Sequence, residues 1–201
     1  MNSQEAIEHL RQDASIRPLL SQIEVPDFTP SGRVYYDLLE SIVSQQLSVK
    51  VADVIFKRFI SLFPDQYPHP DKLIEIDFDK LRSVGLSNQK ANYLQNVARF
   101  TIENDLESIA WHQKSEAEII SLLTQIKGVG TWTVQMLLMF TLGRPDVFPV
   151  DDLGIQQAMQ KLFSIEEENT RLLKKQMIAY AEPWRPYRTY ACRYLWRWKD
   201  Q

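Results

Sequence analysis

Two glycines, Gly128 and Gly130, stand two residues apart in the stretch QIKGVGTWTVQMLLMF, directly before an apolar helical run. A glycine tolerates a positive φ, and its missing Cβ lets another group approach the backbone closely. The unpaired N–H groups at the start of the next helix, together with its dipole, attract a phosphate. The stretch therefore predicts either a phosphate-binding hairpin or a plain turn between two helices.

Two carboxylates, Asp151 and Asp152, follow about twenty residues later in GRPDVFPVDDLGIQQAM. Either one could cap the helix that begins near Leu153. A carboxylate held in this way is also suited to chemistry, because a fixed anion stabilises positive charge that develops in a reaction. Both roles can belong to the same residue, since a capping aspartate is held rigidly.

Two further residues do not fit the apolar stripes of their helices. Trp196 lies roughly opposite the stripe of its segment, so it either packs against another part of the chain or faces a ligand. Gln46 is a polar residue on an otherwise apolar stripe, which favours either a solvated helix end or a contact outside the core. The stripe opposite Trp196 consists of Tyr187, Tyr190, Ala191, Tyr194, Leu195 and Trp198.

The bulk composition limits the class of protein. The chain has 201 residues, a net charge of −3 and one cysteine, Cys192, which excludes an internal disulfide and a cysteine-ligated iron–sulfur cluster. It has no apolar run of the roughly 18 residues that a membrane span needs, and no secretory signal. We expect an intracellular protein in a reducing compartment. The acidic balance argues against bulk electrostatic binding of nucleic acid, but it leaves room for a local site.

The elements that must position these residues are helices. Apolar residues recur at three- and four-residue spacing over 34–47 and 50–63, and no long alternation of apolar and polar residues indicates a sheet. Ser87 is expected to cap one helix, and Ser115 with Glu118 forms a capping box at the start of another. The sequence predicts an all-α protein of roughly ten helices.

Three of these motifs together resemble the helix-hairpin-helix (HhH-GPD) superfamily of DNA glycosylases, and within it the DNA-3-methyladenine glycosylase II group. They are IKGVGTWTVQ, the loop that ends in Asp152, and WRPYRTYACRYLW. The resemblance implies one domain over 1–201 with two helical lobes and a cleft between them. Lobe one would cover approximately 33–145, including the hairpin at 123–140. Lobe two would cover approximately 1–32 plus 146–201.

The resemblance also implies site residues. Asp152 would be catalytic, because aligning the helix that follows with that of the family favours Asp152 over Asp151. Asp151 would then shape the loop. Gln46, with Gln45 beside it, would be the wedge that fills the gap left by a flipped nucleotide. The hairpin residues that would bind phosphate are Lys127, Gly128, Val129, Gly130 and Thr131. Lys127 stands where the family usually has a proline. The base pocket would contain Trp132, Trp196, Met136 and Leu153. Main-chain carbonyls of Thr124, Ile126 and Val129 would hold a structural Na⁺ or K⁺.

Trp132 bears on the reaction type, because relatives that also cut the strand carry a lysine nucleophile at this position. The resemblance thus implies a monofunctional glycosylase that hydrolyses the N-glycosidic bond of alkylated purines such as 3-methyladenine and 7-methylguanine. Electron-rich indole rings would attract a cationic base. We expect no required cofactor and no membrane partner. We expect a monomer acting on double-stranded DNA with alkylated bases, in the cytoplasm of a bacterium or the nucleus of a eukaryote.

Two alternatives stay open. Met136 and Leu153 stand where relatives carry tyrosines, so the substrate could instead be a deaminated or oxidised base. A non-catalytic DNA-binding module that uses only the hairpin is the second alternative. Asp152 argues against that module, because a carboxylate facing DNA repels phosphate.

Overall fold

The computed structural model describes residues 3–199. All regular elements in this part of the chain are helical, so the all-α expectation is confirmed. No helix within it combines the length and apolar character that crossing a bilayer requires. The α-helices are α1 (Ser3–Leu10), α2 (Arg17–Gln22), α3 (Val34–Ser44), α4 (Val49–Ile60), α5 (Pro70–Glu75), α6 (Phe78–Ser83), α7 (Asn88–Glu103), α8 (Glu116–Leu123), α9 (Thr131–Met136), α10 (Leu153–Phe163), α11 (Thr170–Ala181) and α12 (Arg188–Lys199). Three short 3₁₀ helices, Leu106–Ser108, Trp111–Gln113 and Glu182–Trp184, and a π-helical segment, Leu137–Thr141, complete the set.

The helix starts follow their capping residues. The Ser87 hydroxyl accepts a hydrogen bond from the Lys90 N–H at 3.2 Å, which fixes the first turn of α7. Ser115 and Glu118 form the reciprocal capping box at the start of α8, with the Ser115 N–H donating to Glu118 Oε2 at 2.8 Å. Each such cap contributes about 1 kcal/mol to stability. Both capping predictions are confirmed.

Contacts between Cα atoms divide the chain into two compact units. The hairpin unit is residues 31–137, and the terminal unit is residues 1–30 together with 138–201. The sequence placed the lobe boundaries near 33 and 145, whereas the structure divides the chain at 30/31 and 137/138. The second division comes earlier because Phe140, in the segment before residue 145, packs against Phe28 and Trp196 of the terminal unit.

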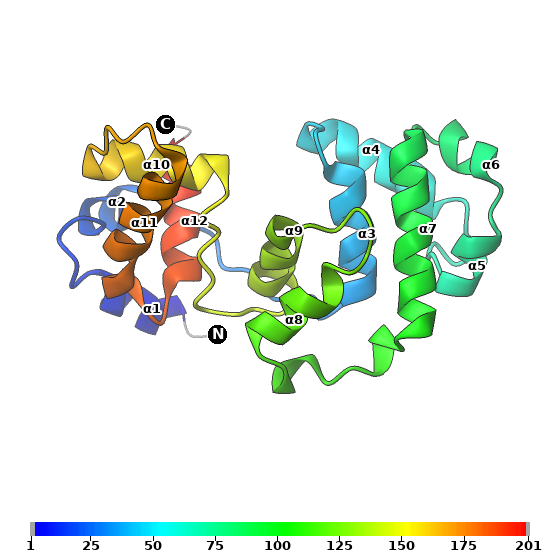
Figure 1. Ribbon diagram of the computed structural model, residues 1–201, viewed down its shortest axis with the longest axis horizontal. Coiled ribbons are helices and arrows are strands. Elements are labelled where there is room, and N and C mark those ends of the chain that lie inside the picture. Colours follow the sequence, from blue (N-terminus) through cyan, green and yellow to red (C-terminus); the bar gives the residue numbers. More distant parts are fainter. Residues whose placement is uncertain (1–2, 200–201) are drawn as a thin grey trace. The chain divides into compact units, whose positions relative to one another are not determined.

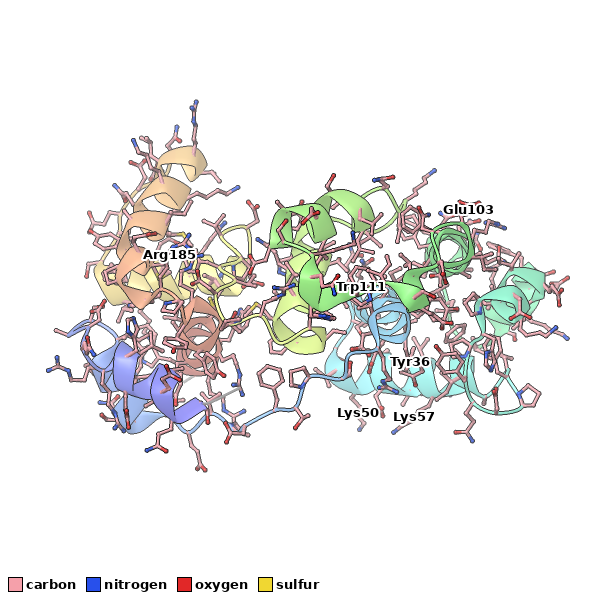
Figure 2. All side chains as sticks on the ribbon, turned by 90° about the horizontal axis from the view of Figure 1, so that it is seen from below. Tyr36, Lys50, Lys57, Glu103, Trp111 and Arg185 are labelled. Carbon is pink, nitrogen blue, oxygen red and sulfur yellow. The ribbon has the colours of Figure 1, made fainter. Side chains whose placement is uncertain are left out.

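In the hairpin unit, α7 packs against both α3 and α5, and Figure 1 shows it beside α3. Its buried face consists of Ala91, Leu94, Val97, Ala98 and Thr101. Helices α8 and α9 pack together as the two arms of the hairpin. The outer face of α4 carries Lys50 and Lys57, whose side chains are exposed and point away from α3 (Figure 2).

In the terminal unit, α12 packs against α10, α1 and α2 (Figure 1). Six of its residues are buried: Thr189, Tyr190, Ala191, Cys192, Tyr194 and Leu195. Trp184 is fully buried and donates its indole N–H to Asp13 Oδ2 at 2.9 Å, which ties the C-terminal segment to the region before α2. This packing holds α12 and the first turn of α10 in a fixed relation.

Candidate functional site

Asp152 is the N-cap residue of α10. Its Oδ1 accepts a hydrogen bond from the Ile155 N–H at 2.8 Å, and the residue is half-buried. The expectation of a capping aspartate before Leu153 is therefore confirmed. The cap fixes the rotamer of the carboxylate, so its charge is held in one place.

The same oxygen of Asp152 accepts a second hydrogen bond, from Nε1 of Trp196 on α12, at 2.8 Å. Gly154 makes this bond possible. A Cβ at Gly154 would lie 3.0 Å from Cδ1 of Trp196 and 3.1 Å from Oδ1 of Asp152, closer than such atoms normally approach. The indole thus lies against the first turn of α10 because that turn contains a glycine. Gly154 was not among the residues predicted from the sequence, where a lone glycine does not show which side chain approaches it.

Asp151 is exposed and forms an ion pair with Lys174 of α11. The two neighbouring carboxylates therefore have separate partners: Asp151 faces α11, whereas Asp152 faces α12. Only Asp152 is both the cap of α10 and the acceptor of an indole N–H.

An ion-pair cluster fixes the loop that leads to Asp152. The Asp146 carboxylate binds Arg188 through Nε at 2.7 Å and through a second guanidinium nitrogen at 2.9 Å. Arg185 adds a third contact at 2.9 Å. The side chains of Arg188 and Asp146 are only 11% and 19% exposed, so this bidentate pair is partly shielded from solvent and stronger than an ordinary surface pair.

The Thr189 side chain binds the backbone of the same loop. Its hydroxyl donates to the Arg144 carbonyl at 2.7 Å and accepts from the Val147 N–H at 3.0 Å. The side chain is fully buried. Thr189 and the Asp146–Arg188 pair were not predicted from the sequence, because the partners in these contacts lie more than 40 residues apart along the chain.

An aromatic row extends from the indole of Trp196. The Phe140 ring lies 6.1 Å from the Trp196 ring and 5.6 Å from Phe28, centroid to centroid. Phe140 is 39% exposed, which is high for a phenylalanine. The row gives the terminal unit an accessible aromatic surface beside Asp152, and Phe140 was not among the predicted pocket residues.

In the hairpin, the two glycines have different environments. Gly128 has a φ of +107°, and a Cβ there would lie 2.3 Å from the ring of Tyr93. Gly130 has an ordinary extended conformation with a φ of −96°, and a Cβ there would meet no atom within 4 Å. Gly128 therefore makes the turn, whereas Gly130 leaves the start of α9 open. Lys127 and Thr131 are exposed, and Val129 is buried.

The turn between α3 and α4 contains both predicted wedge residues. Gln46 is exposed and has a left-handed backbone with a φ of +59°. The Gln45 side chain instead donates its amide N–H to the Gly128 carbonyl at 3.5 Å. Of the two glutamines, Gln46 is thus exposed, whereas the Gln45 side chain contacts the hairpin.

Comparison with known proteins gives this arrangement a family. Residues 39–186, more than half of the chain, match the family described as HhH-GPD superfamily base excision DNA repair protein. The chain belongs to this superfamily.

Curated relatives of this HhH-GPD protein carry related names. DNA-3-methyladenine glycosylase 1 of Schizosaccharomyces pombe is 38% identical over 165 residues, which cover 81% of this chain and 71% of the relative. The putative DNA-3-methyladenine glycosylase YfjP of Bacillus subtilis is 35% identical over 170 residues, which cover 82% of this chain. The match spans only 58% of YfjP, little more than half its length.

A solved structure shares the fold. The 3-methyladenine DNA glycosylase Mag1 of Schizosaccharomyces pombe, determined in complex with abasic DNA, superimposes with a TM-score of 0.83. The two are 34% identical, and the match covers 98% of this chain and 97% of the other. The HhH-GPD assignment from the hairpin, loop and C-terminal helix is confirmed.

The predicted site residues of the HhH-GPD protein lie in both units. The structure brings Asp152, Leu153 and Trp196 together in the terminal unit, where Leu153 is 66% exposed. Trp132, which is 41% exposed, and the half-buried Met136 belong to α9 in the hairpin unit. These two residues are four apart on one helix and therefore share a face.

The predicted cation donors follow the C-terminus of α8. The carbonyl of Ile126 accepts a hydrogen bond from the Val129 N–H at 3.0 Å, which bends the chain at this point. Among the side chains of residues 3–199, no group of three or more His, Cys, Asp or Glu is arranged to hold a metal ion.

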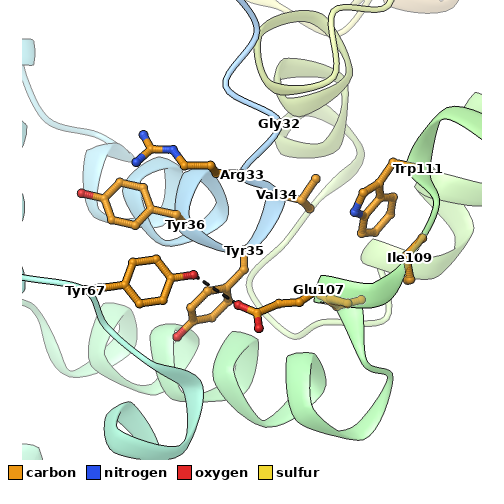
Figure 3. A pocket seen from close by; sticks show the side chains of 10 residues that line it. Gly32, Arg33, Val34, Tyr35, Tyr36, Tyr67, Glu107, Ile109 and Trp111 are labelled. Carbon is orange, nitrogen blue, oxygen red and sulfur yellow. Dashed lines mark hydrogen bonds between the residues drawn. The ribbon is translucent and has the colours of Figure 1, made fainter.

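A separate pocket of about 350 Å³ lies at the N-terminal end of α3 (Figure 3). Its aromatic wall is formed by Tyr36 and Tyr67, stacked with ring centroids 5.9 Å apart, and Trp111 also lines it. The Tyr67 hydroxyl donates to Glu107 at 3.2 Å, and burial together with this carboxylate raises the pKa of Tyr67 to about 12. Arg33 lies over the Tyr36 ring at 4.3 Å. The pocket is at the opposite end of α3 from Gln45.

Proposed function

We propose that this protein is a monofunctional DNA glycosylase that removes alkylated purines, of the 3-methyladenine and 7-methylguanine type, in base excision repair. One observation carries the proposal: the Asp152 carboxylate is fixed by a helix cap and by the Trp196 indole, beside an accessible aromatic row. The names of the relatives and of the DNA-bound neighbour support the same class of substrate.

The chemistry needs a fixed anion. Cleavage of an N-glycosidic bond develops positive charge on the deoxyribose, and a carboxylate that cannot rotate away stabilises that charge without reorganising. Asp152 would also orient the attacking water. An alkylated purine is already cationic and leaves readily, so a strong general acid is not required. The indole of Trp196 and the ring of Phe140 would attract such a base through cation–π contact.

The hairpin unit would supply DNA binding. The open start of α9 at Gly130, flanked by exposed Lys127 and Thr131, would bind a backbone phosphate. Gln46 would fill the space left by the flipped nucleotide, as its exposed position allows. A Na⁺ or K⁺ at the carbonyls of Thr124, Ile126 and Val129 would reinforce the hairpin, and no other cofactor is proposed.

Strand cleavage is not part of the proposed activity. Lyase chemistry needs an amine that forms a Schiff base with the deoxyribose. Trp132 carries no amine and stands where lyase members of the family have their lysine. Borohydride trapping on DNA with an abasic site should therefore give no covalent complex.

The test compares base release from methylated duplex DNA by wild type, Asp152→Asn and Asp151→Asn. Asparagine caps helices as well as aspartate does, so Asp152→Asn should keep its thermal stability. We expect a loss of at least about 100-fold in single-turnover release for Asp152→Asn, as for removal of one electrostatic stabiliser. Asp151→Asn is the matched control and should stay within a few-fold of wild type.

Two outcomes would contradict the proposal. Equal release by wild type and Asp152→Asn would remove Asp152 from catalysis. Tight binding to alkylated duplex without release by wild type would indicate a non-catalytic DNA-binding module.

A further inference from the structure

Three side chains of α7 point to two loops that are far apart in the sequence. Lys90, Tyr93 and Asn96 are spaced three residues apart and so share one face of the helix. They contact the wedge turn (residues 45–48) and the turn of the hairpin (residues 124–130). All of these residues belong to the hairpin unit, where α7 stands beside α3 (Figure 1).

Lys90 binds the start of the wedge turn. Its Nζ donates to the Val43 carbonyl at 2.7 Å and to the Gln45 carbonyl at 2.8 Å. These carbonyls lie at the C-terminus of α3, where a cation satisfies acceptors that the helix leaves unpaired. The side chain is half-buried, and burial lowers the pKa of Lys90. Its ammonium is thus engaged by the protein rather than presented to solvent.

Tyr93 and Asn96 bind the hairpin from the same face of α7. The Tyr93 ring fills the space that Gly128 leaves open. The Asn96 amide donates to the Lys127 carbonyl at 3.4 Å. Gln45 connects the two loops directly, through its bond to the Gly128 carbonyl. The wedge turn and the hairpin are therefore linked both through α7 and to each other.

We propose that Lys90 is a positioning residue that sets the place of the wedge, Gln46, relative to the phosphate-binding hairpin. This rests on the proposed function. Gln46 has a left-handed backbone that a non-glycine residue adopts only when its neighbours hold it. The Lys90 ammonium holds the carbonyl directly before it. A phosphate bound at the hairpin would then fix where Gln46 enters the duplex.

Lys90 could instead be a phosphate contact, as lysines in DNA-binding proteins often are, and the two roles differ measurably. Loss of a phosphate contact lowers the salt dependence of DNA binding by about 0.9 in the log–log slope and weakens every duplex alike. Loss of wedge positioning leaves that slope unchanged. It affects the substrates in which a base pair must be opened.

The experiment uses Lys90→Met, with Lys57→Met as the matched control, since Lys57 is an exposed lysine on the outer face of α4 (Figure 2). Two duplexes carry the same alkylated base, one paired normally and one opposite an abasic-site analogue, where no partner base must be displaced. We expect Lys90→Met to lower single-turnover release about tenfold or more on the paired duplex. On the other duplex the loss should be less than about threefold. Lys90→Arg, which can still donate to both carbonyls, should restore most of the difference, and Lys57→Met should match wild type.

Wedge insertion is also measured without catalysis, by 2-aminopurine fluorescence next to a tetrahydrofuran abasic-site analogue. Lys90→Met should give a smaller fluorescence rise than wild type at saturating protein, with an unchanged salt slope. This measurement separates the positioning role of Lys90 from the proposed glycosylase activity, because the fluorescence change can be compared even if wild type releases no alkylated base. If Lys90→Met does not fold, the same measurement is made with Asn96→Ala, which removes a contact between α7 and the hairpin without removing a charge. The positioning role would be overturned if Lys90→Met lost release equally on both duplexes or lowered the salt slope of DNA binding. It would also be overturned if Lys90→Met and Asn96→Ala both gave the fluorescence rise of wild type.

Discussion

The indole Nε1 of Trp196 donates a 2.8 Å hydrogen bond to Oδ1 of Asp152, the same oxygen that caps α10. The residue proposed to stack on the damaged base is thus bonded to the residue proposed to stabilise the sugar. In the proposed function, that bond would place a base stacked on Trp196 relative to the carboxylate. Loss of the indole N–H group should therefore change base release even where an aromatic ring is kept.

Trp196→Phe keeps an aromatic ring and removes the donor to Asp152. A hydrogen bond to a charged group contributes about 1.5–3 kcal/mol, so single-turnover base release should fall by roughly 10- to 100-fold. Affinity for DNA with an abasic-site analogue should change little, because the hairpin is untouched. Trp198→Phe is the control, since Trp198 lies on the same helix and contacts Lys161 instead. Unchanged release by Trp196→Phe would show that the indole N–H has no part in positioning Asp152.

Gly154→Ala should separate stability from activity. Alanine is favoured over glycine in a helix by up to about 1 kcal/mol, so α10 itself gains. The new methyl would lie 3.0 Å from Trp196 and 3.1 Å from Asp152, and one of the two must move. We expect an unchanged or slightly raised melting temperature together with at least a tenfold lower release rate. Gln157→Ala, at an exposed position of the same helix, reports the helix effect alone. Full activity in Gly154→Ala would mean that the Trp196–Asp152 bond is not needed.

How much could be predicted depended on whether a feature is local in the sequence. The cap at Asp152 and the hairpin glycines leave short patterns, so the chain itself indicates them. The contacts of Lys90 and Thr189 end on backbone carbonyls, which every residue has, more than 40 positions away. No residue type marks such a partner. Phe140 was missed for another reason: it lies in the π-helical segment, where the regular helical period no longer tells which side a residue faces.

The two hairpin glycines should respond differently to alanine. Gly128→Ala places a side chain at a φ of +107° and inside the ring of Tyr93, so we expect a loss of at least about 2 kcal/mol in unfolding free energy. Gly130→Ala meets no protein atom within 4 Å and has a permitted backbone, so its stability should stay within about 0.5 kcal/mol of wild type. Its DNA affinity should nevertheless fall, because the methyl covers the open start of α9. Chemical denaturation and duplex binding measure the two effects, and wild-type affinity in Gly130→Ala would place the phosphate elsewhere.

Cys192 gives a pH-dependent prediction for the terminal unit. Burial, and secondarily the negative charge of Asp152, raises the pKa of its thiol well above the ordinary value. The unfolded chain ionises this thiol near pH 8.5, whereas the folded chain does not, so unfolding releases a proton as the pH rises. The stability present below pH 8.5 should therefore decline above it, by up to about 1.4 kcal/mol per pH unit for this one group. Urea denaturation between pH 7.5 and about 9.5, below the range where tyrosines of an unfolded chain ionise, measures the slope. Cys192→Ala should remove that part of the slope, and an identical pH dependence in the variant would show that the thiol is not protected by the fold.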